Sequence, residues 1–467
     1  MTTTGIDPTR VSALELARLL REGVLGAVES TRAFLARIDE VEPEVQAWAH
    51  LDPEHALKQA EELELNRSMG RPIGPLYGVP VGVKDIIDAH GLPSEDGTVL
   101  HAGRRPIDDA TVVTRLREAG AIILGKTVTT ELATFSPGKT RNPWNAEHTP
   151  GGSSSGSAAA VAAGMVPLAI GTQTNGSVIR PAAYCGVVGF KPTFGQISRF
   201  RILAQSRALD QVGVFARTVG EAAWLAELLT GFDENDPDTR LAARPDWLEV
   251  ARQEPPMPPR LAMAPTPIWS QAEPDTREAF EELHAMLNER LAGDEDRTEG
   301  EPSVPWIELA EAFGQAWECH RLIHESDLAH HLRQEYDRGR DQLSATLCQQ
   351  IERGRTIAAV DYLLARERAA GMARLLDEYL EDYDAFVTPA TAGTAPAGLE
   401  STGSPAFCTL WTLAGLPAIT LPLMRGGNGL PLGVQLVGAR GNDGRLLRTA
   451  RWLSELVQRE TADEAQA

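Results

Sequence analysis

The sequence predicts an α/β fold: a single large domain in which one mixed, twisted sheet is flanked by helices on both faces. Its 467 residues, 42% of them hydrophobic, are enough to bury a large core. Between residues 76 and 220, short apolar runs alternate with helical stretches and Gly-rich turns, which is typical of α/β proteins. Residues 384–440 return to short strands separated by Pro and Gly, and we expect these strands to complete the earlier sheet.

The individual elements follow from local patterns in chain order. Two amphipathic helices are expected over residues 11–40, the first with Ser12 as N-cap and Glu15 three residues later, a capping-box pattern. The central region contains apolar runs of strand length that are bounded by turn residues. The expected strands are 79–87, 121–126, 166–171, 186–190 and 212–216.

We expect the whole chain, 1–467, to form one domain. Its core covers about 70–220, a variable and largely helical part covers about 235–380, and the strands of 384–440 complete the sheet. Acidic residues and prolines are concentrated between 233 and 310. We interpret this stretch as surface excursions rather than as a domain boundary.

Composition narrows the possible functions. A formal net charge of −21 argues against nucleic acid or an anionic membrane as the partner. The first residues lack the pattern of a secretory signal and no run of about eighteen apolar residues occurs, so we expect a cytoplasmic protein. The four cysteines show no CxxC spacing, which predicts buried thiols rather than a disulfide scaffold or a zinc ribbon.

Lysine is scarce in this chain, since only five of the 44 Lys and Arg residues are lysines. Lys84 directly follows the small apolar run 78–83, which predicts a buried strand that delivers one amine to an interior site. Burial lowers the pKa of an amine until it can act as a base, whereas a guanidinium stays charged. Lys84 is therefore the candidate base.

Two Gly/Ser clusters supply candidate hydroxyl groups. Ser153 lies in a Gly-rich turn that opens a helix of small residues and presents free backbone N–H groups. A phosphate loop is a weak alternative there, because no Lys-Ser/Thr pair follows the glycines and no GxGxxG occurs. Ser177 lies in the second cluster, where neighbouring N–H groups would suit a nucleophile. The ten histidines lie in no motif typical of a base, which leaves Lys84 with a hydroxyl as bridge.

These residues belong to a collinear set of motifs, and through that set the chain resembles the amidase signature family. The resemblance implies that Ser177 is the acyl-accepting nucleophile, Ser153 the proton-relaying serine and Lys84 the base. It implies no metal and no cofactor. The matching segments are 74–80, 83–85, 125–127, 142–145, 150–154, 171–181, 185–193, 415–418 and 430–438.

The resemblance also implies two backbone features of the site. The peptide bond between Gly152 and Ser153 is expected to be cis. The oxyanion of the tetrahedral intermediate is expected to bind to backbone amides of the turn before the nucleophile. These amides belong to Thr174, Asn175, Gly176 and Ser177.

The nucleophile turn departs from the family's common pattern, Gly-Thr-Asp-Thr-Gly-Gly-Ser-Ile-Arg. Gln173 replaces the Asp, Asn175 replaces a Gly, and Arg180 follows the nucleophile by three residues rather than two. This order resembles a malonamidase-like or urethanase-like branch. We therefore expect Arg180, Gln173 and Leu132 to contact the substrate; a structural ion pair is the alternative for Arg180, and a packed helix is the alternative for Leu132.

The remaining candidates lie outside the signature motifs. Asp210 is expected to order the sheet edge near the site. His320 and His324 have the i, i+4 spacing of metal ligands, but no third ligand is visible and a solvated helix face is the favoured interpretation. The charged helices around 317–345 form either a lid over the acyl pocket or a plain outer layer.

The function that these observations favour is hydrolysis of a C–N acyl bond in a small-molecule amide, anilide or carbamate. The protein would act as a monomer or homodimer, without nucleic acid or membrane. One alternative is an amidotransferase subunit that amidates aminoacyl-tRNA, although the acidic composition suits tRNA poorly. Another is an inactive family member that acts as a scaffold. The sequence does not identify the substrate.

Overall fold

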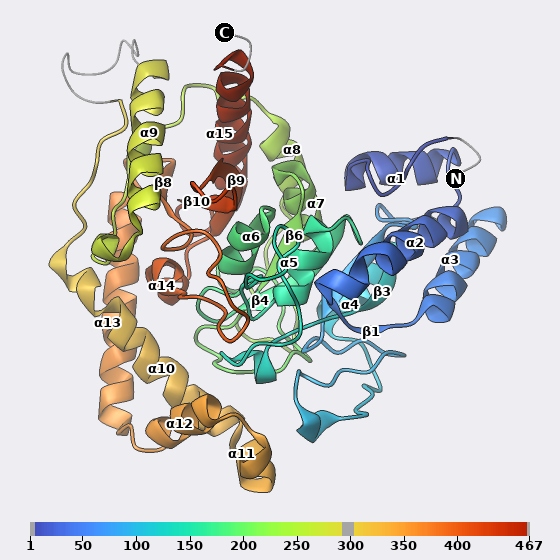
Figure 1. The fold of residues 1–467 in the computed structure, drawn as a ribbon, viewed down its shortest axis with the longest axis horizontal. Coiled ribbons are helices and arrows are strands. Elements are labelled where there is room, and N and C mark those ends of the chain that lie inside the picture. Colours follow the sequence, from blue (N-terminus) through green and yellow to red (C-terminus); the bar gives the residue numbers. More distant parts are fainter. Residues whose placement is uncertain (1–4, 292–302, 465–467) are drawn as a thin grey trace.

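The computed structural model describes residues 5–291 and 303–464 (Figure 1). Ten strands of the described residues form one mixed sheet with helices on both faces, as the sequence predicts. The strands follow one another across the sheet as β1 (Trp48–Leu51), β3 (Ile122–Thr127), β2 (Pro80–Lys84), β4 (Leu168–Gln173), β6 (Gln211–Ala216), β5 (Val188–Lys191), β9 (Ala418–Arg425), β10 (Pro431–Val437), β8 (Ala385–Pro389) and β7 (Leu261–Met263).

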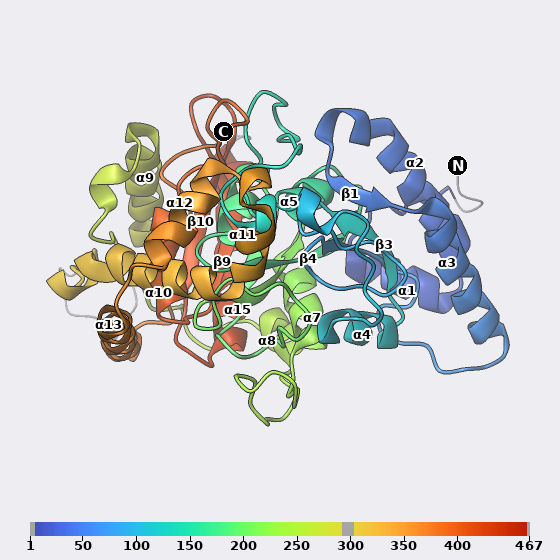
Figure 2. The ribbon, with the colours of Figure 1, turned by 90° about the horizontal axis from the view of Figure 1, so that it is seen from below.

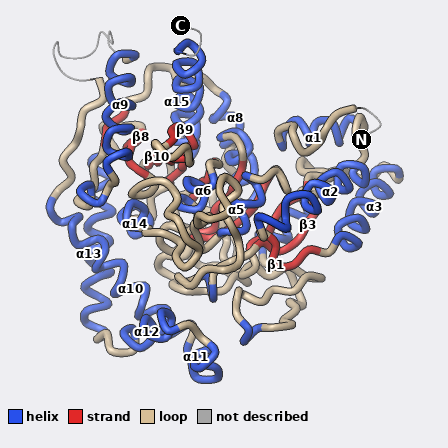
Figure 3. The backbone as a smooth tube through the Cα atoms, in the orientation of Figure 1, coloured by secondary structure: helices blue, strands red, loops and turns tan. Residues whose placement is uncertain are grey.

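The α-helices of the described residues are α1 (Ala13–Glu22), α2 (Ala27–Val45), α3 (Pro53–Ser68), α4 (Thr111–Glu118), α5 (Ser155–Ala162), α6 (Ile179–Cys185), α7 (Val219–Leu229), α8 (Trp247–Arg252), α9 (Pro274–Arg290), α10 (Ala316–His331), α11 (Arg333–Gly339), α12 (Ala345–Gly354), α13 (Ala359–Tyr379), α14 (Ala406–Leu413) and α15 (Asp443–Glu464). Figure 2 shows α5 and the α7–α8 pair on opposite sides of β4. Figure 3 separates the strands at the centre from the helices around them.

The pairing of strands at the centre of the sheet brings polar side chains together at one edge. Strand β2 lies between β3 and β4 and runs parallel to both. Every residue of β2 and β4 is buried because helices cover both faces, which accounts for their continuous apolar runs. The carboxyl ends of parallel strands lie at the same edge of a sheet. Lys84 ends β2 and Gln173 ends β4, so both lie at that edge.

Helix α5 contacts β2, β3 and β4 closely because its residues are small. The helix is buried from Ser155 through Val161. A Cβ atom at Gly156 would lie 2.3 Å from both the backbone N of Val128 and the carbonyl O of Ala47, so no larger residue fits at this position. The Gly/Ser/Ala composition of 151–164 therefore holds the Ser153 turn against the sheet.

The predicted strands and the N-cap Ser12 are confirmed, but the Glu15 side chain bonds Arg18 and does not complete the capping box. Ser12 Oγ accepts a hydrogen bond from the Glu15 N–H, and the C-terminal strands join the sheet where β9 pairs with β5. Residues 292–302 of the stretch 233–310 lie outside the described residues. In the rest of the stretch the interpretation as surface excursions is wrong in part, because β7 is a buried edge strand parallel to β8 and α9 packs Phe280 and Leu287 into the core. Three residues carry too little periodicity to predict a strand. Within residues 5–291 and 303–464, none of the helices combines the length and the apolar character that a membrane span requires.

Candidate active site

Lys84 brings an amine to the carboxyl edge of the sheet. Its side chain is fully buried, and its Nζ lies 2.7 Å from the Oγ of Ser153 and 2.8 Å from the Oγ1 of Thr172. Burial lowers the pKa of Lys84 well below its usual value, and the charge of Asp210 opposes this shift only in part. The amine is thereby shifted toward its neutral form, which can accept a proton from a hydroxyl.

Ser153 lies in the turn before α5, and the peptide bond between Gly152 and Ser153 is cis, as expected. The carbonyl groups of Gly152 and Ser153 both accept hydrogen bonds. The Arg180 guanidinium donates to the Gly152 carbonyl at 2.7 and 3.3 Å, and the Thr130 N–H donates to the Ser153 carbonyl at 3.3 Å. The Ser153 hydroxyl is therefore fixed next to Lys84 Nζ.

Ser177 lies in the tight turn between β4 and α6. Its side chain is mostly buried, and its hydroxyl makes no hydrogen bond within the described part of the chain, to Ser153 or to any other group. The Gln173 Oε1 accepts hydrogen bonds from the N–H groups of Val178 at 2.8 Å and Ile179 at 3.0 Å, which caps the start of α6. This cap joins the end of β4 to the helix and sets the shape of the turn.

In the backbone of residues 174–177, carbonyl groups have hydrogen-bond partners while the amide groups have none in the ranges that the structure describes. Three successive carbonyls accept hydrogen bonds: Thr174 from His320 Nε2 at 2.9 Å, Asn175 from the Thr412 hydroxyl at 2.5 Å and Gly176 from the Arg180 N–H at 2.9 Å. The amides of residues 174–177 donate to no acceptor among the described residues. Free amides in this arrangement can bind a negatively charged oxygen.

Asp210 supports the turn from the neighbouring strand. It precedes β6, and its carboxylate accepts a hydrogen bond from the Thr174 hydroxyl at 2.6 Å and from the N–H groups of Gln205 and Ser206, both at 2.9 Å. Burial raises the pKa of Asp210 to about 6. The expectation that Asp210 orders this edge of the sheet is confirmed.

The three residues expected to contact substrate are all deeply buried. Gln173 uses its amide N–H to bond Thr412 and its oxygen for the α6 cap. Arg180 donates to the carbonyls of Gly152 and Gly403 and forms no ion pair with the described residues, so the structural ion pair considered for it is wrong. Leu132 packs in an apolar cluster with residues of α10 and α12. Each side chain thus has partners within the protein, and its contact with substrate stays a prediction.

The expectation of a solvated helix face at His320 and His324 is wrong, because both side chains are buried. Helix α10 packs against the site, where His320 bonds the Thr174 carbonyl and His324 Nε2 lies 3.0 Å from Gln205 Oε1. Burial lowers the pKa of His320 to about 4 and that of His324 to about 3. No group of three or more His, Cys, Asp or Glu residues in the described ranges could hold a metal ion.

Three functional contacts were missed in the sequence. The Gly171-Thr172 pair near the end of β4 could have indicated Thr172 as a partner of Lys84, because Thr172 lies beside Lys84 at the same edge of the sheet. No local pattern indicates His320 or Thr412. They are 146 and 237 residues away from the carbonyls that they bond.

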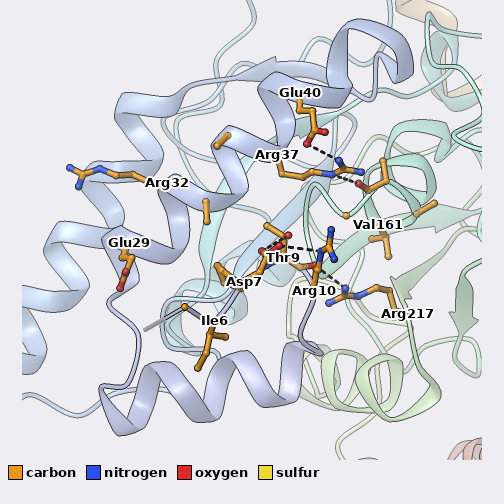
Figure 4. Close-up of a pocket in the computed structure, with 17 residues that line it drawn as sticks. Ile6, Asp7, Thr9, Arg10, Glu29, Arg32, Arg37, Glu40, Val161 and Arg217 are labelled. Atoms are coloured by element: carbon orange, nitrogen blue, oxygen red, sulfur yellow. Dashed lines mark hydrogen bonds and ion pairs between the residues drawn. The ribbon is translucent and has the colours of Figure 1, made fainter. Parts of the chain in front are cut away.

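A cavity of about 280 Å³ adjoins the site. Thr172, Thr174 and Asp210 are among the residues that line it, and Ile86, Ala133 and Leu203 contribute apolar lining, whereas Lys84, Ser153 and Ser177 do not line it. A larger hollow of about 1290 Å³ lies elsewhere, between residues 5–10 and α2 (Figure 4). None of the residues that line this larger hollow belongs to the Lys84 site.

The site combines a buried lysine beside two hydroxyl groups with a turn whose amides are free, and it lies on a mixed sheet covered by helices. Such a site and fold define a class of proteins, the hydrolases of C–N bonds. The chain belongs to the amidase family, whose model "Amidase" matches residues 29–447. It is 37% identical over 474 residues to a curated relative from Symbiobacterium thermophilum, a glutamyl-tRNA(Gln) amidotransferase subunit, covering 96% of each chain.

Two solved structures extend the comparison. The 6-aminohexanoate cyclic dimer hydrolase is similar with a TM-score of 0.85 and 27% identity, covering 97% of this chain and 98% of that one. The peptide amidase of Stenotrophomonas maltophilia is similar with a TM-score of 0.80 and 29% identity, covering 96% and 97%. The family is thus confirmed, while the malonamidase-like or urethanase-like branch stays a prediction.

Proposed function

We propose that this protein hydrolyses the C–N acyl bond of a small amide, anilide or carbamate through an acyl-enzyme on Ser177. The observation that carries the proposal is the contact of 2.7 Å between the buried Lys84 amine and the Ser153 hydroxyl, beside a turn whose amides are free. A buried amine with a lowered pKa is a base, and free amides stabilise an oxyanion.

In the proposed reaction, the Ser177 oxygen attacks the carbonyl carbon while its proton passes to Ser153 and the Ser153 proton passes to Lys84. The resulting oxyanion binds to the amides of residues 174–177. When the C–N bond breaks, the proton returns through Ser153 to the leaving nitrogen, and an amine departs. Water then attacks the acyl group on Ser177, which restores the hydroxyl and releases a carboxylic acid from an amide or anilide, or a carbonic acid monoester from a carbamate.

A second candidate is the amidotransferase subunit, which the similarity to the Symbiobacterium protein over nearly the whole chain favours. The same residues would then release ammonia from an amide donor such as glutamine, and partner subunits would use it on glutamyl-tRNA. The net charge of −21 does not suit direct contact with tRNA, so partners would have to provide that contact.

The test uses the purified full chain alone. It is assayed on p-nitroacetanilide, small aliphatic amides, an aryl carbamate and L-glutamine, with Ser177→Ala as the inactive control, and Ser177 is labelled with a fluorophosphonate. Turnover of an amide or carbamate that Ser177→Ala lacks supports the main proposal. Turnover of glutamine only supports the second candidate. No turnover and no labelling of Ser177 would overturn the main proposal and favour the scaffold.

A further inference from the structure

The carbonyls of the nucleophile turn decide where its amides point. In a trans peptide unit the C=O and the N–H lie in one plane and point in opposite directions. A partner that holds the Thr174 carbonyl therefore sets the direction of the Asn175 N–H. A partner that holds the Asn175 carbonyl sets the direction of the Gly176 N–H in the same way.

His320 of α10 holds the first of these carbonyls. Its Nε2 lies 2.9 Å from the Thr174 oxygen, and a carbonyl oxygen can only accept, so Nε2 carries the hydrogen. The low pKa of His320, caused by burial, keeps the ring neutral with this single donor. The side chain is 3% exposed, so the contact is shielded from bulk water.

Thr412 of α14 holds the second carbonyl. Its hydroxyl donates to the Asn175 oxygen at 2.5 Å and accepts from the Gln173 Nε2 at 2.9 Å. One helical turn earlier, the Thr409 hydroxyl donates to the Asn175 Oδ1 at 2.8 Å. Gln173 and Asn175 are the two residues of the turn that differ from the family's common sequence. The side chain of each forms a hydrogen bond with a threonine hydroxyl of α14.

Packing brings the turn close to α14 and leaves little room for a side chain at Gly176. A Cβ atom at Gly176 would lie 3.0 Å from Pro405 and 3.2 Å from the Sγ of Cys408. The turn thus lies against α14 and is bonded from α10, while its amides remain on the open side.

We propose that His320 and Thr412 are positioning residues, which aim the Asn175 and Gly176 amides at the oxyanion of the substrate. The inference rests on the proposed function, since an oxyanion forms only if Ser177 accepts an acyl group. It assigns a role in catalysis to two helices that lie outside the signature core.

The test compares His320→Phe and Thr412→Val with the wild-type full chain. Each variant removes one hydrogen-bond donor with little change of volume. We expect kcat to fall by about 10- to 100-fold while KM changes by less than about threefold, because the oxyanion exists only in the transition state and intermediate. Thr412→Ser keeps the hydroxyl and is expected to retain kcat within about threefold.

Two matched controls lie far from the turn. His284→Phe removes a histidine contact of 2.9 Å to the Val304 carbonyl, and Thr31→Val removes a buried hydroxyl that donates to the Ala27 carbonyl. Both are expected to leave kcat unchanged. The inference is overturned if His320→Phe and Thr412→Val fold and keep kcat within about twofold, or if Thr412→Ser is as slow as Thr412→Val.

Crystal structures of the two variants test the inference without turnover. We expect the 174–175 peptide to rotate in His320→Phe and the 175–176 peptide to rotate in Thr412→Val. An unchanged turn in both variants would overturn the inference. An inactive, unlabelled wild-type chain would instead overturn the proposed function, and the crystal structures would still decide whether His320 and Thr412 position the turn.

Discussion

Replacing Lys84 by methionine removes the amine at the buried end of the proposed relay and keeps a flexible side chain of similar length. A positioned general base contributes about 10²- to 10⁴-fold to the rate. When catalytic residues act as one unit, removing one of them costs nearly as much as removing all of them. We therefore expect kcat to fall by at least about 10³-fold. Lys84→Arg should lose nearly as much, since a guanidinium cannot accept the proton.

The stability of Lys84→Met can be estimated from its contacts. The Ser153 and Thr172 hydroxyls each lose their amine partner, at about 1–3 kcal/mol for a buried polar group left without a partner. Removing an amine that has no ion pair in the described residues offsets part of this cost, because the amine is itself desolvated. We therefore expect the free energy of unfolding to change by less than about 3 kcal/mol.

Lys191→Met is the matched control. Lys191 is also fully buried, with a pKa lowered to about 7 by burial, and its Nζ bonds the Gln211 Oε1 at 2.7 Å and the Leu416 carbonyl at 2.5 Å. Thermal denaturation and anilide turnover are measured for both variants. A similar loss of stability with turnover lost only at Lys84 supports the relay. Turnover above about a tenth of wild type in folded Lys84→Met or Lys84→Arg would refute it.

Three further predictions concern other parts of the structure. His101 bonds Asp96 and Glu335, which raise the pKa of His101 to about 9. We expect wild type to be more stable than His101→Gln by about 1–2 kcal/mol after solvent screening. This difference in the free energy of unfolding, measured by urea titration, should be complete below about pH 6.5 and disappear as the pH rises toward 9. Gly156→Ala should cost more than about 3 kcal/mol, measured by denaturation, because the new methyl group would meet backbone atoms. Arg180→Met should lower kcat by about tenfold or more, with two carbonyls left without donors.

The sheet and the Lys84–Ser153 contact could be predicted because their signals are local. Strand β2 reads as an apolar run that ends in one lysine, and the Ser153 turn reads as glycines before a helix of small residues. Parallel pairing then places the ends of β2 and β4 together without further information. Edge strand β7 has no such signal, because three apolar residues among prolines fit many conformations.

The roles of side chains such as Gln173 and Arg180 could not be read in the same way. A polar residue next to a nucleophile suggests substrate contact, but burial requires that each polar atom find a partner, and backbone groups nearby provide one. Gln173 and Arg180 both satisfy backbone groups of the turns. Which groups are free depends on α10 and α14, whose contacts with the turns span more than 140 residues of sequence.

In the proposed mechanism, one part of the chain supplies the reacting groups and another part supplies the donors that position the turn. The proposed chemical groups all lie between residues 84 and 177, whereas the donors that hold the turn's carbonyls at 174 and 175 come from α10 and α14. A backbone amide has no side chain of its own to vary, so the side chains that hold the neighbouring carbonyls are one means by which its direction can change. Changes in α10 and α14 could therefore alter the rate of acyl transfer while Lys84, Ser153 and Ser177 stay the same.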